Sequence, residues 1–301
     1  VFFCFNALFL CYTVDMTSTF EAFLSPHVNR PSFISGWLTA HSVPNTQVLL
    51  SGRTHVVVRF ANTAYDPRFR MKTLVAHHDR APLTPGANDN SAACFQLMLF
   101  AWRLSRLTTI HNVRILFTDG EEAAGVSGIA AQGSYTVGSA LRSRGEDIGD
   151  VYVLDATGRG DTLVVSTTAL DSIKNRQLQR GMDILHQKTR QIARKTAQES
   201  WVSLPTPYSD NAGFLATGIP AQVLTILPAT EATILLHAQS EYTTLDVLTK
   251  PALDDDSRLY YPETWKLMHT PNDGAHTLTP TAFSLMRIFL DNLARTMEGI
   301  E

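Results

Sequence analysis

A short apolar run that ends in two adjacent glutamates constrains the fold of this chain more than any other stretch. Residues 113–117 (VRILF) are typical of a buried strand, and Asp119 and Gly120 end it. Glu121 and Glu122 follow at once. Neighbouring side chains of a strand face opposite ways, so both carboxylates can serve one site only where the backbone bends, which Gly120 permits. A solvated turn after a strand is the alternative interpretation.

Short apolar runs and longer helical patterns alternate along the chain. Strands are predicted at residues 55–60, 73–76, 113–117, 151–154, 162–166 and 222–227. Helices are predicted at residues 19–38 (as two short helices), 92–107, 170–196 and 280–297, and irregular loops at residues 123–138 and 228–262. This interleaving predicts an α/β fold, a three-layer αβα single domain with a central mixed, mostly parallel sheet.

The N-terminal residues differ from the rest in composition. Residues 1–12 are very apolar, but no basic segment precedes them, no A-x-A site follows, and they are too few for a typical membrane helix. We therefore expect an apolar N-terminal segment at residues 1–18, one domain at residues 19–301 and no membrane partner. Residues 228–262 are a predicted lid or insertion, because so long a loop is often a specificity element. If translation begins at Met16, the predicted location is cytoplasmic, with export as the alternative.

Charge and cysteine content narrow the classes of function. The formal net charge of −3 and the isoelectric point near 6.4 give no electrostatic reason to expect a nucleic-acid partner. The three cysteines (Cys4, Cys11 and Cys94) are an odd and sparse set, which argues against a disulfide framework. No pair of them has zinc-finger spacing, so any metal would be held by histidine and carboxylate side chains.

Candidate ligand groups follow three predicted strands directly: His77, the pair Glu121 and Glu122, and Asp155. The carboxyl ends of parallel strands lie along one edge of a sheet, so these groups can converge there. Asp89 comes just before a predicted helix, within reach of the same edge. A mixture of imidazole and carboxylate suits Zn²⁺ and other divalent metals. Taken singly, each residue also has a structural interpretation, as a packed histidine, a helix cap or a turn residue.

Six short motifs occur in a characteristic order. They are Ala76-His77-His78-Asp79, Gly86-Ala87-Asn88-Asp89-Asn90, Asp119-Gly120-Glu121-Glu122, Leu154-Asp155, Ser209-Asp210 and His269-Thr270-Pro271-Asn272-Asp273. In this order they resemble the zinc-dependent M28 peptidases and their relatives, the animal-type glutaminyl cyclases. The resemblance runs from about residue 74 to about residue 278 and implies the zinc-peptidase, phosphorylase/hydrolase-like version of the αβα fold.

The resemblance implies a metal centre of five ligands. His77 and Asp155 would hold one zinc ion, Glu122 and His269 would hold a second, and Asp89 would bridge the two. One or two zinc ions per chain are expected, and two are favoured.

The resemblance also implies how catalysis would proceed. Glu121 would be the general base that takes a proton from a metal-bound water and passes it to the leaving amine. Asp79 would orient His77, as a carboxylate does for a metal-bound imidazole. A cis peptide bond is expected at Asp89-Asn90.

Two departures from the family pattern bear on the reaction. The cyclases carry a tryptophan immediately before the ligand histidine, whereas this chain has Met268 before His269. Asn211 follows Asp210 where the family often has a histidine. We therefore expect a hydrolase of peptide N-terminal residues, similar to the aminopeptidases, acting on peptide or amino-acyl substrates. A single-zinc glutaminyl-peptide cyclotransferase and an inactive metal-binding interaction domain are the alternatives. The oligomeric state is not predicted.

Overall fold

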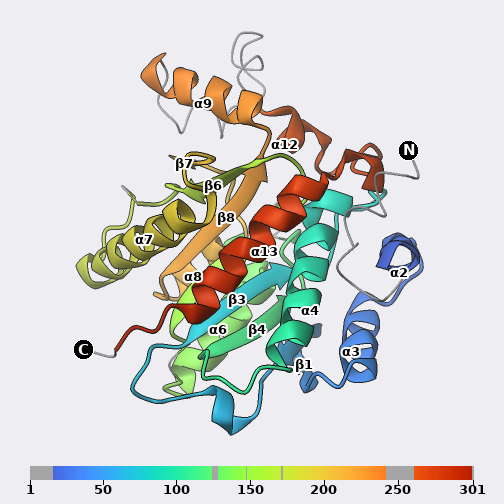
Figure 1. Ribbon diagram of the computed structural model, residues 1–301, viewed down its shortest axis with the longest axis vertical. Coiled ribbons are helices and arrows are strands. Elements are labelled where there is room, and N and C mark those ends of the chain that lie inside the picture. Colours follow the sequence, from blue (N-terminus) through green and yellow to red (C-terminus); the bar gives the residue numbers. More distant parts are fainter. Residues whose placement is uncertain (1–15, 124–127, 147, 171, 242–260, 300–301) are drawn as a thin grey trace.

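Eight strands form one sheet, and its interior strands are the apolar runs of the sequence. The computed structural model describes residues 16–123, 128–146, 148–170, 172–241 and 261–299 (Figure 1). The strands are β1 (Asn45–Leu50), β2 (Arg53–Val58), β3 (Lys72–His77), β4 (Val113–Thr118), β5 (Asp150–Leu154), β6 (Thr162–Ser166), β7 (Trp201–Leu204) and β8 (Ala221–Leu227). Their order is β1-β2-β4-β3-β5-β8-β6-β7.

The sheet is mixed, with a parallel centre. Strands β4, β3, β5 and β8 run parallel to one another, and β7 is parallel to β6. The pairs β1·β2, β2·β4 and β6·β8 are antiparallel. The four central strands are buried along their whole length, as expected for a sheet covered on both faces.

Helices cover both faces of the sheet. They are α2 (Met16–Leu24), α3 (Arg30–Ala40), α4 (Ala92–Leu104), α6 (Gly133–Ser143), α7 (Arg176–Ala197), α8 (Asn211–Ala216), α9 (Ala229–Glu241), α12 (Glu263–Leu267) and α13 (Pro280–Arg295). Helices α4, α7 and α13 pack on one face, whereas α6 and α8 pack on the other (Figure 1). The alternation of side chains along β4 divides its residues between these layers, with Ile115 and Phe117 on the first side and Leu116 on the second.

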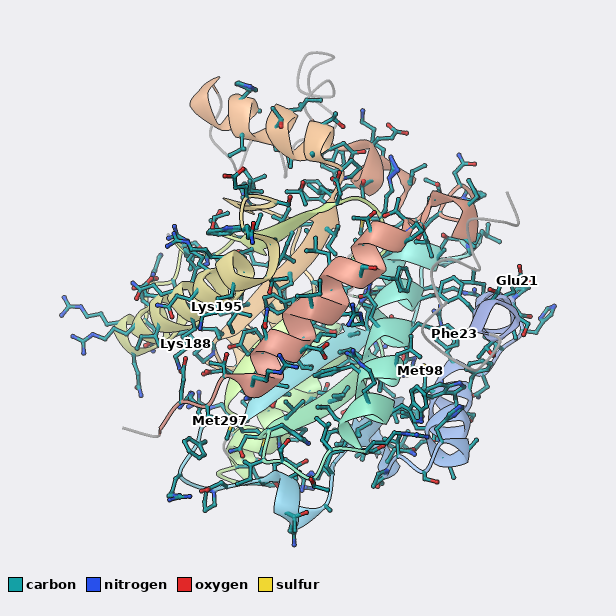
Figure 2. All side chains as sticks on the ribbon, in the orientation of Figure 1. Glu21, Phe23, Met98, Lys188, Lys195 and Met297 are labelled. Atoms are coloured by element: carbon teal, nitrogen blue, oxygen red, sulfur yellow. The ribbon has the colours of Figure 1, made fainter. Side chains whose placement is uncertain are left out.

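The helices α2 and α3 belong to the first layer, in which α3 packs against β1, β2 and α4. Phe23 of α2 and Met98 of α4 are both fully buried (Figure 2). The ring of Phe23 lies 5.4 Å from that of Phe95 on α4. The expected pair of short helices covering the core is therefore present, and the predicted single αβα domain with a mixed, mostly parallel sheet is confirmed.

Two predicted loops are partly helical. The second half of the segment 123–138 belongs to α6, because its glycines allow close packing rather than flexibility: a Cβ on Gly133 would lie 1.8 Å from the carbonyl oxygen of Asp119. Residues 229–241 form α9. Its apolar residues lie on both sides of the helix, since Ala232 and Leu235 are buried whereas Ile234 and Leu236 are exposed. The sequence therefore lacks an amphipathic pattern here.

Helix α7 and the two edge strands of the sheet also differ from prediction. Helix α7 begins at Arg176 rather than at residue 170, because the side chain of Asn175 accepts hydrogen bonds from the backbone of Gln177 and Leu178. The edge strands β1 and β7 were not predicted, because each is short and partly exposed and lacks the apolar run of a buried strand.

Two predictions fall largely outside the described residues. These are the apolar segment 1–18, of which residues 16–18 belong to α2, and the central part of the predicted lid, residues 242–260. Among the helices that the structure describes, none is long and apolar enough to cross a membrane.

Lys72 provides a test of how β3 and α13 are joined. Its buried ammonium group donates hydrogen bonds to the carbonyl oxygens of Leu293, Ala294 and Thr296, at 3.2, 3.2 and 2.6 Å. A cation at a helix C-terminus satisfies carbonyl groups that have no partner within the helix. We expect Lys72→Met to lower the free energy of unfolding by about 1.5–3 kcal/mol, measured by denaturant unfolding at pH 7.

The effect of Lys72 on stability should also depend on pH. Burial lowers the pKa of Lys72 to about 8, so between about pH 8 and the ordinary lysine pKa the unfolded chain binds more protons than the folded one. Stability conferred by Lys72 therefore rises with pH in this window, and the loss in Lys72→Met should be larger at pH 9.5 than at pH 7. Lys266→Met is the control, because Lys266 is exposed and lies 3.9 Å from Glu263. Equal free energies of unfolding for Lys72→Met and Lys266→Met would show that Lys72 does not stabilise the junction of β3 and α13.

Candidate metal centre

Three neighbouring strands deliver acidic and imidazole side chains to one edge of the sheet. Strand β3 ends at His77, which is in register with Thr118 at the end of β4. Glu121 follows β4 after a bend at Gly120, where φ is 83°. Residues other than glycine rarely adopt this φ, so the turn favours glycine. Asp155 follows β5, the other neighbour of β3.

One group of possible ligands surrounds His77. Its Nε2 atom lies 3.2 Å from Asp89 Oδ1 and 3.8 Å from Asp155 Oδ1. His77 and Asp89 are almost completely buried, and the side chain of Asp155 is 13% exposed. One nitrogen and two carboxylate oxygens therefore meet within 4.8 Å of one another.

A second group surrounds His269, which the chain supplies from a distant loop. His269 Nε2 lies 3.1 Å from Asp89 Oδ2 and 3.0 Å from Glu122 Oε2. Asp89 thus directs one oxygen to each histidine. The structure brings together all five residues predicted as ligands, with the side chain of His269 half exposed.

The donor atoms fit divalent metal ions. Ligand atoms bonded to one zinc ion at about 2.0–2.2 Å lie about 3–3.5 Å apart, close to the distances within each group. Asp155 Oδ1 and Glu122 Oε1 are buried, and neither forms a hydrogen bond within the described part of the chain. Hydrogen bonds with Asp89 and Glu122 raise the pKa of His269 to about 11. The carboxylates of Asp89 and Glu122 therefore stabilise a positive charge at the position of the His269 ring.

The loop that carries Asp89 is fixed by a residue that the sequence interpretation left without a role. The carboxylate of Asp273 accepts hydrogen bonds from the backbone N–H groups of Asn88 and Asp89, at 2.8 and 3.0 Å. Asn90 donates from its side chain to the carbonyl oxygen of Leu154, at 2.8 Å. The peptide bond Asp89-Asn90 is cis, as predicted. Asp273 belongs to the same motif as His269, and this shared motif was the only sequence signal for its role.

Asp79 contacts both the imidazole and the turn that carries the glutamates. Its Oδ1 lies 3.5 Å from His77 Nδ1, and its two oxygens accept hydrogen bonds from the backbone of Glu121 and Glu122, at 3.2 and 3.1 Å. Burial alone would raise the pKa of Asp79, but interactions with His77 lower it to about 2. His78 points the other way and lies 2.8 Å from the carbonyl oxygen of Thr54.

Glu121 lies beside the ligand groups and takes part in neither pair around Asp89. One of its carboxylate oxygens is within 4.8 Å of ligand atoms of His77 and Glu122. Burial raises the pKa of Glu121 well above its ordinary value, His77 opposes this shift, and the nearby Asp155 reinforces it. Gln132, which the sequence interpretation did not single out, donates a hydrogen bond to Glu121 Oε1 at 3.2 Å. A carboxylate with a raised pKa beside a metal centre is suited to proton transfer.

An open cleft of about 560 Å³ gives access to the centre. Asp89, Glu121, Glu122, Asp155 and His269 line one part of it. Apart from Gln132, apolar and aromatic residues line the remainder: Ala81, Pro82, Ile129, Pro207, Tyr208, Ala212, Tyr261, Trp265 and Met268. The arrangement can hold cations beside a carboxylate and admit an organic molecule of moderate size.

Solved structures of similar fold include two peptidases and a cyclase. An aminopeptidase of Legionella pneumophila, LapA, shares 16% identity at a TM-score of 0.64, covering 97% of this chain and 75% of that one. A Zn-dependent exopeptidase of Parabacteroides distasonis has 12% sequence identity and a TM-score of 0.61. The match covers 97% of this chain and 98% of that one. A glutaminyl cyclase of Porphyromonas gingivalis has 13% sequence identity and a TM-score of 0.60. The match covers 92% of this chain and 95% of that one. At these identities the likeness concerns the fold alone.

Comparison of the sequence itself gives a family. A search of the curated proteins finds no match. The model of peptidase family M28, in contrast, matches residues 55–292. These residues include all seven predicted site residues and the six strands β3 to β8. The chain belongs to peptidase family M28.

Proposed function

We propose that this chain is a zinc-dependent aminopeptidase that removes residues from the N-terminus of peptides. The observation that carries the proposal is the position of Asp89, which presents one oxygen to the group around His77 and the other to the group around His269. A carboxylate shared in this way suits a pair of metal ions a few ångströms apart. The family membership and the zinc named in the descriptions of two solved structures of similar fold support zinc as the metal.

Each residue has a role in the proposed reaction. His77 and Asp155 would hold one zinc ion, Glu122 and His269 the other, and Asp89 both. Bound zinc would supply a Lewis acid that polarises the scissile carbonyl group and activates water. Glu121 would take the proton released as water attacks the carbonyl carbon, and would transfer it to the leaving amine. Asp79, ionised and in contact with His77, would keep that imidazole in place.

The cleft supports a peptide as the substrate. Its apolar part accepts a side chain or a stretch of peptide backbone, while Glu121 and the ligand carboxylates line the reacting end. The competing proposal is glutaminyl cyclisation with one zinc ion, which is favoured by the fold shared with the P. gingivalis cyclase. Met268, rather than an aromatic residue, lies next to His269 in the cleft wall. This is why we favour hydrolysis.

Replacing the proposed base should separate catalysis from metal binding. We expect Glu121→Gln to keep its metal and to lose at least about 100-fold in kcat, because the amide cannot accept the proton. The measurement is kcat on an amino-acid anilide together with elemental analysis. Glu146→Gln is the control, since Glu146 is a surface residue whose partners Arg59 and Arg144 are exposed. Full turnover in Glu121→Gln would show that Glu121 is not the base.

Metal content should follow the two ligand groups. We expect two zinc equivalents in the purified chain and about one in His269→Ala, which leaves the group around His77 intact. Chelation should lower Tm, because an ion that binds only the folded chain stabilises it. The control is His27→Ala. His27 is exposed and lies 50 residues before His77 in the sequence, so this variant should keep both zinc equivalents. One equivalent in the unaltered chain, with no loss in His269→Ala, would contradict the two-metal arrangement.

Product analysis distinguishes the three candidate functions. The chain should release free amino acids from peptides and amino-acid anilides, and should not cyclise peptides that begin with glutamine. Mass spectrometry identifies either product, because cyclisation releases ammonia and leaves the peptide otherwise whole. Cyclisation with one zinc equivalent would select the cyclase. Bound metal without either reaction would select an inactive interaction domain.

A further inference from the structure

Gln132 occupies a buried position between the proposed base and the opposite wall of the cleft. It precedes α6 directly, and its residue surface is only 2% exposed. Its side chain nevertheless lines the cleft together with Glu121 and Ala212 of α8. A primary amide has two N–H donors and an oxygen that can accept two hydrogen bonds, so the partners of a buried amide define its orientation.

The partners of Gln132 fix which end of the amide faces the base. Nε2 donates to Glu121 Oε1 at 3.2 Å and to the carbonyl oxygen of Ser209 at 3.4 Å. Oε1 accepts from the hydroxyl group of Ser134 at 3.4 Å. Both partners of Nε2 are acceptors, and the hydroxyl of Ser134 supplies the donor. The amide therefore presents its N–H groups to Glu121 and cannot turn over without losing hydrogen bonds.

The backbone around Gln132 is held at a fixed distance from the turn that carries Glu121. The N–H of Gly133 donates to the carbonyl oxygen of Gly120, at 3.4 Å. Gly133 lies so close to Asp119 that a Cβ there would overlap its carbonyl oxygen. On the other side, a Cβ on Gly213 of α8 would lie 2.3 Å from the hydroxyl oxygen of Ser134. The two glycines thus allow the start of α6 to lie close to the turn of Glu121 and to α8.

We infer that Gln132 is a positioning residue for the general base, a role that rests on the proposed function of Glu121. By donating to Oε1, the amide holds one carboxylate oxygen and leaves Oε2 for the reacting proton. It also limits rotation of a side chain that would otherwise point freely into an open cleft. The residue makes no contact with the five ligand residues in the hydrogen bonds described, so its removal should change proton transfer and leave the metal in place.

The experiment compares kcat, KM and metal content in Gln132→Leu, which keeps the approximate volume and removes the amide. We expect kcat to fall about 10- to 100-fold, the range typical of residues that orient catalytic groups, with KM within about twofold and zinc content unchanged. Gln187→Leu, on the exposed side of α7, is the matched control. An unchanged kcat in folded Gln132→Leu, or a loss confined to KM, would overturn the role. If the Leu variant fails to fold, Gln132→Met, an unbranched side chain of similar length that also lacks the amide, carries the test with the same expected loss.

A double-variant cycle separates this inference from the proposed function. In the Glu121→Gln background, Gln132→Leu should add less than about a twofold loss, because a residue that acts through Glu121 has nothing left to position. A further loss of 10-fold or more would show that Gln132 acts elsewhere. If Glu121→Gln itself keeps its turnover, the proposed function fails. If Glu121→Gln is inactive and Gln132→Leu is fully active, only the role of Gln132 fails.

Discussion

Repulsion among carboxylates gathered at one edge of the sheet is the constraint on which this structure depends. Asp89, Glu122 and Asp155 meet around two imidazole groups, with Glu121 close by. Buried like charges are unfavourable unless a cation or a proton compensates them. The chain compensates in part: both histidines lie between carboxylates, and backbone N–H groups cap the carboxylates of Asp79 and Asp273 behind the centre. Divalent metal ions would complete this balance.

The sheet supplies the rigidity that such a cluster needs. The three strands that end beside the centre are adjacent, parallel and buried along their length. Their positions are therefore fixed by packing on both faces rather than by the polar groups themselves. Residues held on rigid elements keep their mutual geometry better than residues on free loops. His269 and Asp89 do come from loops, and Asp273 connects those two loops directly.

The fold followed from the sequence because it rests on strong local patterns, whereas the five candidate ligands were named from the order of the motifs and their resemblance to a family. Buried strands appear in the sequence as apolar runs. His77 is the last residue of one such strand, and Glu122 and Asp155 follow the ends of two others. The roles of Gln132 and Asp273 did not follow, because each depends on partners brought close only by the tertiary fold. The start of α6 was expected as an irregular loop for a related reason: the atoms against which Gly133 packs belong to another segment.

The distribution of the ligands along the chain determines when the centre can exist. His77 and Asp89 are synthesised long before His269 and Asp273, whose carboxylate holds the Asp89 loop. A ribosome delivers the chain from its N-terminus, so most of the sheet can form before these last residues emerge. A growing chain therefore has no complete second group and no fixed Asp89 loop. The complete centre can form only once residues 269–273 have been synthesised and have packed against the Asp89 loop.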